Sequence, residues 1–183
     1  MNMLTVSSSI LQELDRTLKA VNSDEIEALT KQITEAGNIF VAGAGRSGLM
    51  MRAFAMRLMH MGFRVYVVGE TVTPGIAEGD LLLIGSGSGE TKTLASMAAK
   101  AHNIKATIGV LTIAPDSTIG QLASTIVHIP AVTKDSTSGS SNQPMGTLFE
   151  QCLLLLLDAT VLRLMENMKL QGTAMYNNHA NLE

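Results

Sequence analysis

Hydroxyl side chains alternate with glycines in one short stretch of the chain, Ser86-Gly87-Ser88-Gly89-Glu90-Thr91. A helical pattern begins at Thr91, and the first turn of a helix presents backbone N–H groups that have no partner within the helix. These N–H groups, together with hydroxyl donors from Ser86, Ser88 and Thr91, suit a phosphate dianion. The stretch predicts a phosphate-binding loop without a Walker lysine or magnesium. The alternative is a flexible turn in which a serine caps the helix.

A second glycine-rich stretch, Gly43-Ala44-Gly45-Arg46-Ser47-Gly48, also follows a predicted strand and precedes a helix. Arg46 and Ser47 lie in this stretch and could contact the same phosphate. The alternative for Arg46 is an ion pair with Glu90. The G-x-G-x-x-G spacing is also typical of dinucleotide sites, with Glu70 as the ribose-binding acid. Two observations argue against a dinucleotide. The chain is short for a dehydrogenase with a separate substrate domain, and the hydroxyl-rich stretch at 86–91 is not part of a dinucleotide site.

Carboxylates and imidazoles are the side chains that most often move a proton in catalysis. Glu150 lies early in a long predicted helix, just before the apolar run from Cys152 to Leu157, and is our candidate general base. The alternative is a surface glutamate near a helix N-terminus. His179 is a second candidate, although a histidine in a polar tail is usually idle. Residues 153–157 are apolar on every side of the helix, which predicts an oligomer interface there.

These candidates need a scaffold, and the apolar runs predict one. Short strands alternate with helical patterns, which is typical of a parallel sheet built from βαβ units. We therefore expect an α/β fold, a doubly wound five-stranded parallel sheet flanked by helices. In the strand order 2-1-3-4-5, the two glycine-rich stretches lie side by side at the switch point where ligands bind. The predicted strands are residues 38–42, 64–68, 80–84, 106–112 and 125–129, and a polar loop is predicted over 134–143.

The composition excludes several classes of function. The 183 residues fit one domain, residues 1–183, and a net charge of −3 with 3% aromatic residues argues against a nucleic-acid partner. A lone cysteine, Cys152, excludes an internal disulfide framework, and no Cys/His spacing matches a zinc site. No apolar run is long enough to cross a bilayer, and the N-terminus has no leader pattern. We expect a cytoplasmic protein with no metal and no membrane contact.

The two glycine-rich stretches together resemble the sugar isomerase (SIS) domain family. Three further stretches narrow this resemblance to the 6-phospho-3-hexuloisomerases of that family, so that it covers essentially the whole chain. These stretches are Phe54-Ala55-Met56-Arg57-Leu58-Met59-His60-Met61-Gly62, Gln143-Pro144-Met145-Gly146-Thr147-Leu148-Phe149-Glu150-Gln151 and His179-Ala180-Asn181-Leu182-Glu183.

The resemblance implies an isomerase that interconverts D-arabino-3-hexulose 6-phosphate and fructose 6-phosphate through an enediolate. In this family the reaction is the second step of formaldehyde fixation in the ribulose monophosphate pathway. The resemblance further implies no cofactor and a homotetramer, with a tail histidine acting across a subunit interface. The site it implies consists of catalytic Glu150, His179 and Arg46 and of phosphate-binding Ser47, Ser86, Ser88 and Thr91.

Two alternatives stay open at this level, another phosphosugar isomerase and a sugar-phosphate sensor. Sensors with SIS domains usually carry an attached DNA-binding or CBS segment, for which this chain has no room. Arabinose 5-phosphate isomerases usually carry CBS domains, and sedoheptulose 7-phosphate isomerases usually hold zinc. Neither feature is evident in the sequence.

Overall fold

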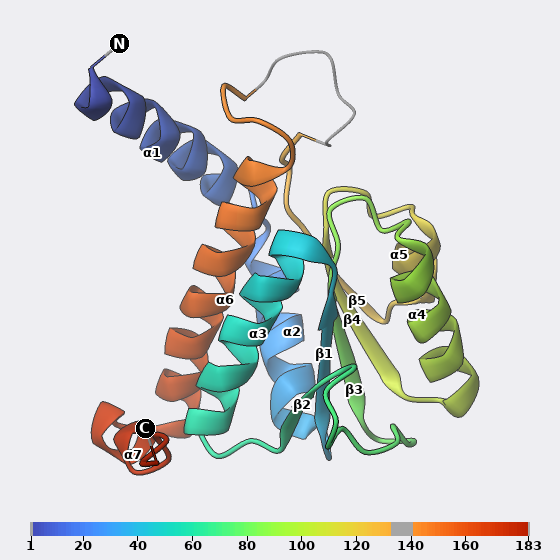
Figure 1. The fold of residues 1–183 in the computed structure, drawn as a ribbon. Helices are drawn as coiled ribbons and strands as arrows, with labels where there is room; N and C mark the ends of the chain where they lie inside the picture. Colours follow the sequence, from blue (N-terminus) through green and yellow to red (C-terminus); the bar gives the residue numbers. More distant parts are fainter. Residues whose placement is uncertain (1, 133–140, 183) are drawn as a thin grey trace.

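The computed structural model describes residues 2–132 and 141–182, and most of the loop predicted over 134–143 lies outside them. Its centre is a five-stranded sheet in the order β2-β1-β3-β4-β5, and every neighbouring pair is parallel (Figure 1). The predicted α/β fold and strand order are confirmed. The strands are β1 (Ile39–Gly43), β2 (Val65–Val67), β3 (Leu81–Gly85), β4 (Thr107–Thr112) and β5 (Thr125–His128).

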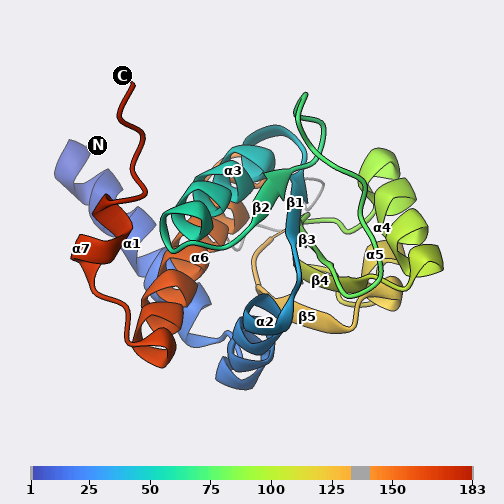
Figure 2. The ribbon, with the colours of Figure 1, turned by 90° about the horizontal axis from the view of Figure 1, so that it is seen from below.

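Alternate residues of each strand feed two separate cores, one on each face of the sheet. In β1, Ile39 and Val41 join the larger core, whereas Phe40 and Ala42 join the smaller one. Both faces are therefore apolar, as a parallel sheet covered on both sides requires. The larger core is closed by α1 (Met3–Lys19), α2 (Ser23–Glu35), α3 (Gly45–His60) and α6 (Thr147–Met168), and the smaller by α4 (Lys92–Ile104) and α5 (Thr118–Leu122) (Figures 1 and 2).

The helix starts differ in detail from the sequence prediction. Asn22, not Ser23, caps α2, because its side-chain oxygen accepts a hydrogen bond from Asp24 N at 2.9 Å. The glycine-rich turn at 43–48 is shorter than predicted, since α3 already begins at Gly45. A Cβ on Gly48 would lie 2.6 Å from the carbonyl oxygen of Gly43. Glycine thus lets the strand end and the helix start touch, which puts residues 46–48 in the first helical turn.

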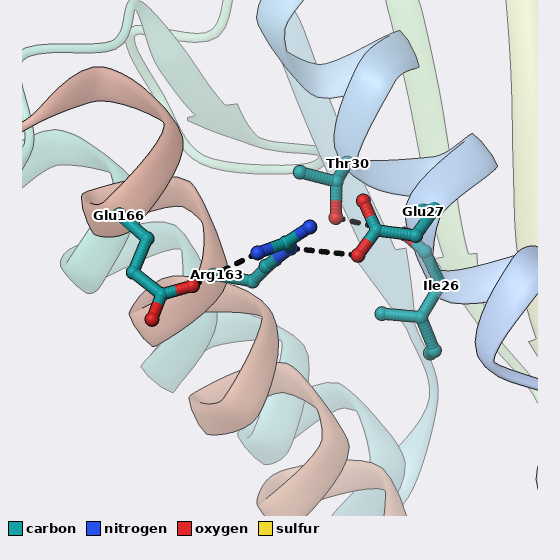
Figure 3. Close-up of polar contacts among 5 residues, drawn as sticks. All are labelled: Ile26, Glu27, Thr30, Arg163 and Glu166. Atoms are coloured by element: carbon teal, nitrogen blue, oxygen red, sulfur yellow. Dashed lines mark hydrogen bonds and ion pairs between the residues drawn. The ribbon is translucent and has the colours of Figure 1, made fainter.

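Helix α6 runs along α3 and also contacts α1 and α2. Leu153, Leu156 and Leu157 are buried in this packing, while Leu155 and Leu162 are 42% and 66% exposed. Much of the apolar surface of the helix is therefore covered within the chain, and only one stripe remains for a partner. Arg163 also ties α6 to α2 through Glu27 at 2.6 Å (Figure 3).

The short helix α7 (Gly172–Tyr176) follows α6 and lies near the end of α3 that is farthest from β1's carboxyl end (Figure 1). Within the described part of the chain, no helix is both long and apolar enough to cross a membrane.

Candidate active site

A cavity of about 300 Å³ opens at the carboxyl ends of β1 and β3. This is the switch point of the sheet, because β2 lies on one side of β1 and the later strands lie on the other. The starts of α3, α4 and α6 converge there, at the upper edge of the sheet in Figure 1. The cavity is lined by Ala44, Gly45, Ser47, Gly85, Ser86, Gly87, Ser88, Thr91, Leu94, Ile113, Gly146, Phe149 and Glu150.

The hydroxyl loop (residues 86–91) is folded so that its serine oxygens already accept hydrogen bonds. Ser86 Oγ accepts from Gly89 N, and Ser88 Oγ accepts from Glu90 N, both at 3.2 Å. A hydroxyl that accepts in this way still has its own proton to donate. Thr91 occupies the N-cap position of α4, and its side chain makes no capping hydrogen bond. The loop therefore presents hydroxyl donors and helix N–H groups to the same cavity.

Two backbone carbonyls of this loop are already engaged by donors from the end of β4 to the start of α5. Gly87 O accepts from Ile113 N at 3.0 Å and from Thr112 Oγ1 at 3.2 Å, and Gly89 O accepts from Ile119 N at 3.2 Å. Because carbonyl oxygens repel an anion, this arrangement favours phosphate binding before any ligand arrives. Nothing local in the sequence of the loop signals these partners.

Gly89 is needed at its position for two reasons. Its φ of +63° is rare for other residues, and a Cβ there would lie 1.9 Å from Ser117 Oγ. The next residue, Glu90, accepts hydrogen bonds from Thr118 N and Thr118 Oγ1, and these bonds lower the pKa of the Glu90 carboxyl. Glu90 thus joins the hydroxyl loop to α5 and is not the partner of Arg46 that we considered from the sequence.

The partner of Arg46 is Glu150. Arg46 Nε lies 3.1 Å from Glu150 Oε2, and Arg46 Nη1 lies 3.5 Å from Thr147 Oγ1. The Glu150 side chain is only 5% exposed, whereas that of Arg46 is 56% exposed. A buried carboxylate thus faces the cavity while an arginine at its mouth balances the charge. The pair joins the first turns of α3 and α6, two segments that are far apart in the chain.

Six of the seven predicted site residues meet around this cavity. Five of them line it, namely Ser47, Ser86, Ser88, Thr91 and Glu150, and Arg46 reaches it through its ion pair. Their chemical roles stay predictions, but the geometry that these roles require is present.

His179 is the exception. Its ring stacks on that of His60 at 5.3 Å and lies 6.2 Å from the ring of Tyr176. His60 is the last residue of α3, whereas the cavity lies at the first turn of that 16-residue helix, roughly 24 Å away at 1.5 Å per residue. His179 therefore cannot act in the cavity of its own chain in this arrangement, and its predicted role requires the cavity of a neighbouring subunit.

Two other residues that the sequence singled out have structural surroundings. Glu70, the acid of the dinucleotide alternative, forms an ion pair with Arg52 of α3. Cys152 is fully buried in α6, and burial raises the pKa of its thiol to about 11. A thiol with so high a pKa is a poor nucleophile at neutral pH.

The comparison with protein families gives the class of this protein. Residues 32–155 match the SIS domain, a span that contains both glycine-rich stretches and Glu150. The doubly wound sheet and the cavity at its switch point are therefore those of a SIS domain protein.

The relatives give the narrower family. The chain is 51% identical over 178 residues to the 3-hexulose-6-phosphate isomerase of Bacillus subtilis, covering 96% of both chains. It is 42% identical over 177 residues to the enzyme of that name from Mycobacterium gastri, covering 96% of this chain and 89% of the relative. This chain belongs to the 3-hexulose-6-phosphate isomerase family of SIS domain proteins.

The solved structures agree with this placement. A Methanococcus jannaschii protein, whose crystal structure was used to infer a function as 3-hexulose-6-phosphate isomerase, superposes with a TM-score of 0.82. It is 35% identical in sequence, and the match covers 97% of each chain. Relatives with this activity favour an enzyme over the sugar-phosphate sensor that the sequence alone left open.

Proposed function

We propose that this protein interconverts D-arabino-3-hexulose 6-phosphate and fructose 6-phosphate through an enediolate intermediate. One observation carries the proposal: a nearly buried carboxylate, Glu150, lines the same cavity as the hydroxyl loop. The loop would hold the phosphate at one side of the cavity, and the carboxylate would meet the carbon chain at the other. The sugar phosphate is thus fixed at its end while its C2 and C3 atoms face a base.

In this mechanism Glu150 removes the proton from C2 of the 3-ketose and returns it to C3. Between these steps the electrons lie in an enediolate over C2 and C3, and the hydroxyl proton moves from O2 to O3. Arg46 lies 3.1 Å from the Glu150 carboxylate and places positive charge where the enediolate oxygens develop. General acid–base catalysis of this kind contributes about 10²–10⁴-fold to the rate.

The group that moves the proton between O2 and O3 is, in our proposal, His179 of a neighbouring subunit. The support for this role is the resemblance to the family, and the location of His179 at the far end of α3 from the cavity of its own chain leaves a neighbouring subunit as the place where it could act. We therefore propose that the protein is a homo-oligomer, a tetramer by resemblance to its family. Exposed apolar side chains on α3 and α6 offer surface for such contacts, among them Leu49, Met56, Leu155 and Leu162.

The pathway and the compartment are part of the same proposal. The reaction would complete formaldehyde fixation in the ribulose monophosphate pathway, in the cytoplasm. No cofactor is needed, since the enediolate mechanism uses only proton transfers and electrostatic stabilisation.

A coupled assay tests the proposed function directly. Hexulose-6-phosphate synthase, formaldehyde and ribulose 5-phosphate generate the 3-ketose in place, and the appearance of fructose 6-phosphate is followed with and without this protein. We expect rapid, protein-dependent formation of fructose 6-phosphate. Saturable binding of the sugar phosphates with no turnover would show that the protein is a sensor instead.

The role of His179 has its own test in the same assay. His179→Ala should lower kcat, and mixing it with an excess of inactive Glu150→Gln subunits should restore activity, because mixed oligomers combine an intact His179 with an intact Glu150. The molar mass in solution, measured by light scattering, gives the size of the oligomer. Full activity of His179→Ala would remove the tail from the mechanism.

A further inference from the structure

A buried carboxylate outside the cavity stands out because the mechanism does not use it. Glu13 lies in α1 and is only 6% exposed. It accepts hydrogen bonds from Ser141 Oγ at 2.6 Å, from Asn142 N at 2.8 Å and from Gln143 Nε2 at 3.1 Å. Burial alone would raise the pKa of the Glu13 carboxyl, but these three bonds, together with the charge of Arg16, outweigh it and lower the pKa. Glu13 is therefore an anionic anchor for the entry segment (residues 141–143).

The entry segment leads directly into the cavity wall. Gly146 lines the cavity, Thr147 Oγ1 contacts Arg46 at 3.5 Å, and Glu150 N bonds to Gly146 O at 3.0 Å. The position of the catalytic carboxylate thus depends on how the chain enters α6.

That entry contains a strained residue. Met145 has a φ of +60°, in the left-handed region that costs a non-glycine residue conformational energy. The Met145 side chain is 71% exposed, so little packing of its own holds the turn in place. Such a conformation persists where the structure on both sides determines it. Helix α6 does so on one side, where Thr147 Oγ1 donates to Pro144 O at 2.7 Å across the turn. The three bonds to Glu13 do so on the other side.

We propose that Glu13 is a positioning residue for the isomerase reaction: through the entry segment it holds the left-handed turn at Met145 and thereby sets Glu150 against Arg46. This inference rests on the proposed function. Glu13 touches neither the cavity nor the hydroxyl loop, so its loss acts on the placement of the base and leaves the phosphate site intact.

The first test is Glu13→Gln, which keeps the shape of the side chain but removes its charge. It also places an amide N–H group next to the three donors that Glu13 now accepts from. A catalytic group displaced by about 1 Å can cost up to about 100-fold in rate, so we expect kcat to fall by about tenfold or more. The inhibition constant for inorganic phosphate should stay unchanged. Glu25→Gln is the matched control, because Glu25 also accepts a backbone hydrogen bond, from His128 N at 2.7 Å, but at the edge strand β5.

A double-mutant cycle separates positioning from general stability. Met145→Gly removes the strain at the turn and should change kcat little in the wild-type background. In the Glu13→Gln background it should restore kcat by about fivefold, because glycine adopts the left-handed turn without help. Coupling of this kind is expected with Glu13→Gln and not with Glu25→Gln.

A second variant and a hydrogen-exchange measurement test the same role without relying on Glu13→Gln turnover. If Glu13→Gln does not fold, Ser141→Ala removes one of the three bonds to Glu13, and the bond from Gln143 N to Ser141 Oγ, without altering α1. It should lower kcat by a smaller factor. Amide hydrogen exchange at residues 142–150 should speed up in Glu13→Gln and not in Glu25→Gln, a readout independent of turnover. An inactive wild type contradicts the proposed function, whereas an active wild type with normal kcat in folded Glu13→Gln or Ser141→Ala contradicts the role of Glu13.

Discussion

The two ends of α6 each hold an arginine–glutamate pair, and the pairs differ in what surrounds them. At the first turn, Glu150 is 5% exposed and lies 3.1 Å from Arg46. Towards the other end, Arg163 and Glu27 are 45% and 48% exposed and lie 2.6 Å apart (Figure 3). The shorter pair is thus the one that water reaches. The distance between the charged atoms therefore does not show which ion pair matters for chemistry, whereas the burial of the carboxylate does.

The physical reason is the cost of taking a charge out of water. An exposed pair gains little, because each partner is solvated well without the other and salt screens their attraction. A buried carboxylate has lost most of its water and depends on its partner and on whatever enters the cavity. Hydrogen bonds to Glu27 and then to Glu166 raise the pKa of the Arg163 guanidinium, which is charged at neutral pH in any case. This difference in burial supports the chemistry that we propose for the first pair, whereas the second pair attaches α6 to α2.

The largest expected effect comes from Glu150→Gln. Removing the base should lower kcat by about 10²–10⁴-fold while the protein stays folded and still binds phosphate. Turnover in the coupled assay and circular dichroism measure both properties. Glu27→Gln is the matched control, because it removes the α2 carboxylate that pairs with Arg163 towards the other end of α6, and it should keep full activity. Near-native kcat in Glu150→Gln would reverse the assignment of the two pairs.

A smaller effect is expected from a substitution in the hydroxyl loop, which lines the same cavity. Ser88→Ala removes a hydroxyl donor from the hydroxyl loop, and one hydrogen bond to a charged group corresponds to about tenfold in binding. The KM for the sugar phosphate should rise by about that factor with a smaller change in kcat. Ser96→Ala, on the exposed part of α4, should leave both constants unchanged. An equal loss of kcat and kcat/KM in Ser88→Ala, with KM unaltered, would argue against a role in ground-state phosphate binding.

The stability of the region where the C-terminal segment packs on His60 should depend on pH. Burial, then Arg57, then His179 lower the pKa of His60 below its ordinary value of 6.5. The unfolded chain therefore takes up this proton at higher pH than the folded chain does, and the free energy of unfolding falls as the pH drops below about 6.5. Thermal unfolding measured between about pH 5 and pH 7, a range that spans the ordinary histidine pKa, should show a lower Tm at the acid end.

His60→Gln should flatten that pH dependence. Arg57 Nη1 lies 3.3 Å from His60 Nδ1, and since arginine only donates, the ring nitrogen accepts. A glutamine oxygen can accept the same bond without titrating. An unchanged slope in His60→Gln would mean that another group controls the acid sensitivity of this region.

The smallest effect is expected from Arg163→Met. It removes both ion pairs of the exposed end, with Glu27 and Glu166, and keeps an apolar stem of similar length. We expect unchanged kcat and KM and a small decrease in Tm. A large loss of activity would show that the two ends of α6 are coupled.

Much of this arrangement was predictable from local sequence patterns. Apolar runs located the five strands, and the placement of the two glycine-rich stretches after the first and third strands brought Arg46, Ser47, Ser86, Ser88 and Thr91 to one cavity, where Glu150 joins them from α6. These predictions succeeded because strand periodicity and the need for glycine at close contacts are properties of short segments.

Other features depended on contacts between distant segments. From the sequence we considered an ion pair between Arg46 and Glu90. In the structure Thr118 donates two hydrogen bonds to Glu90, and Arg46 pairs with Glu150. The anchor at Glu13 was not predicted at all, because Ser141 lies 128 residues away and nothing near Glu13 marks it as different from a surface glutamate.

By itself, the sequence determined the α/β class and the two stretches that form the proposed phosphate site, since each follows from hydrophobic periodicity and backbone freedom within a few residues. The strand order was an assumption that the structure then confirmed. Only the tertiary structure decided which charges pair, which carboxylates lose their water, and that His179 lies at the opposite end of α3 from the cavity. Burial and pairing are set by how helices pack on the sheet, and packing brings together residues whose separation in the chain carries no local signal.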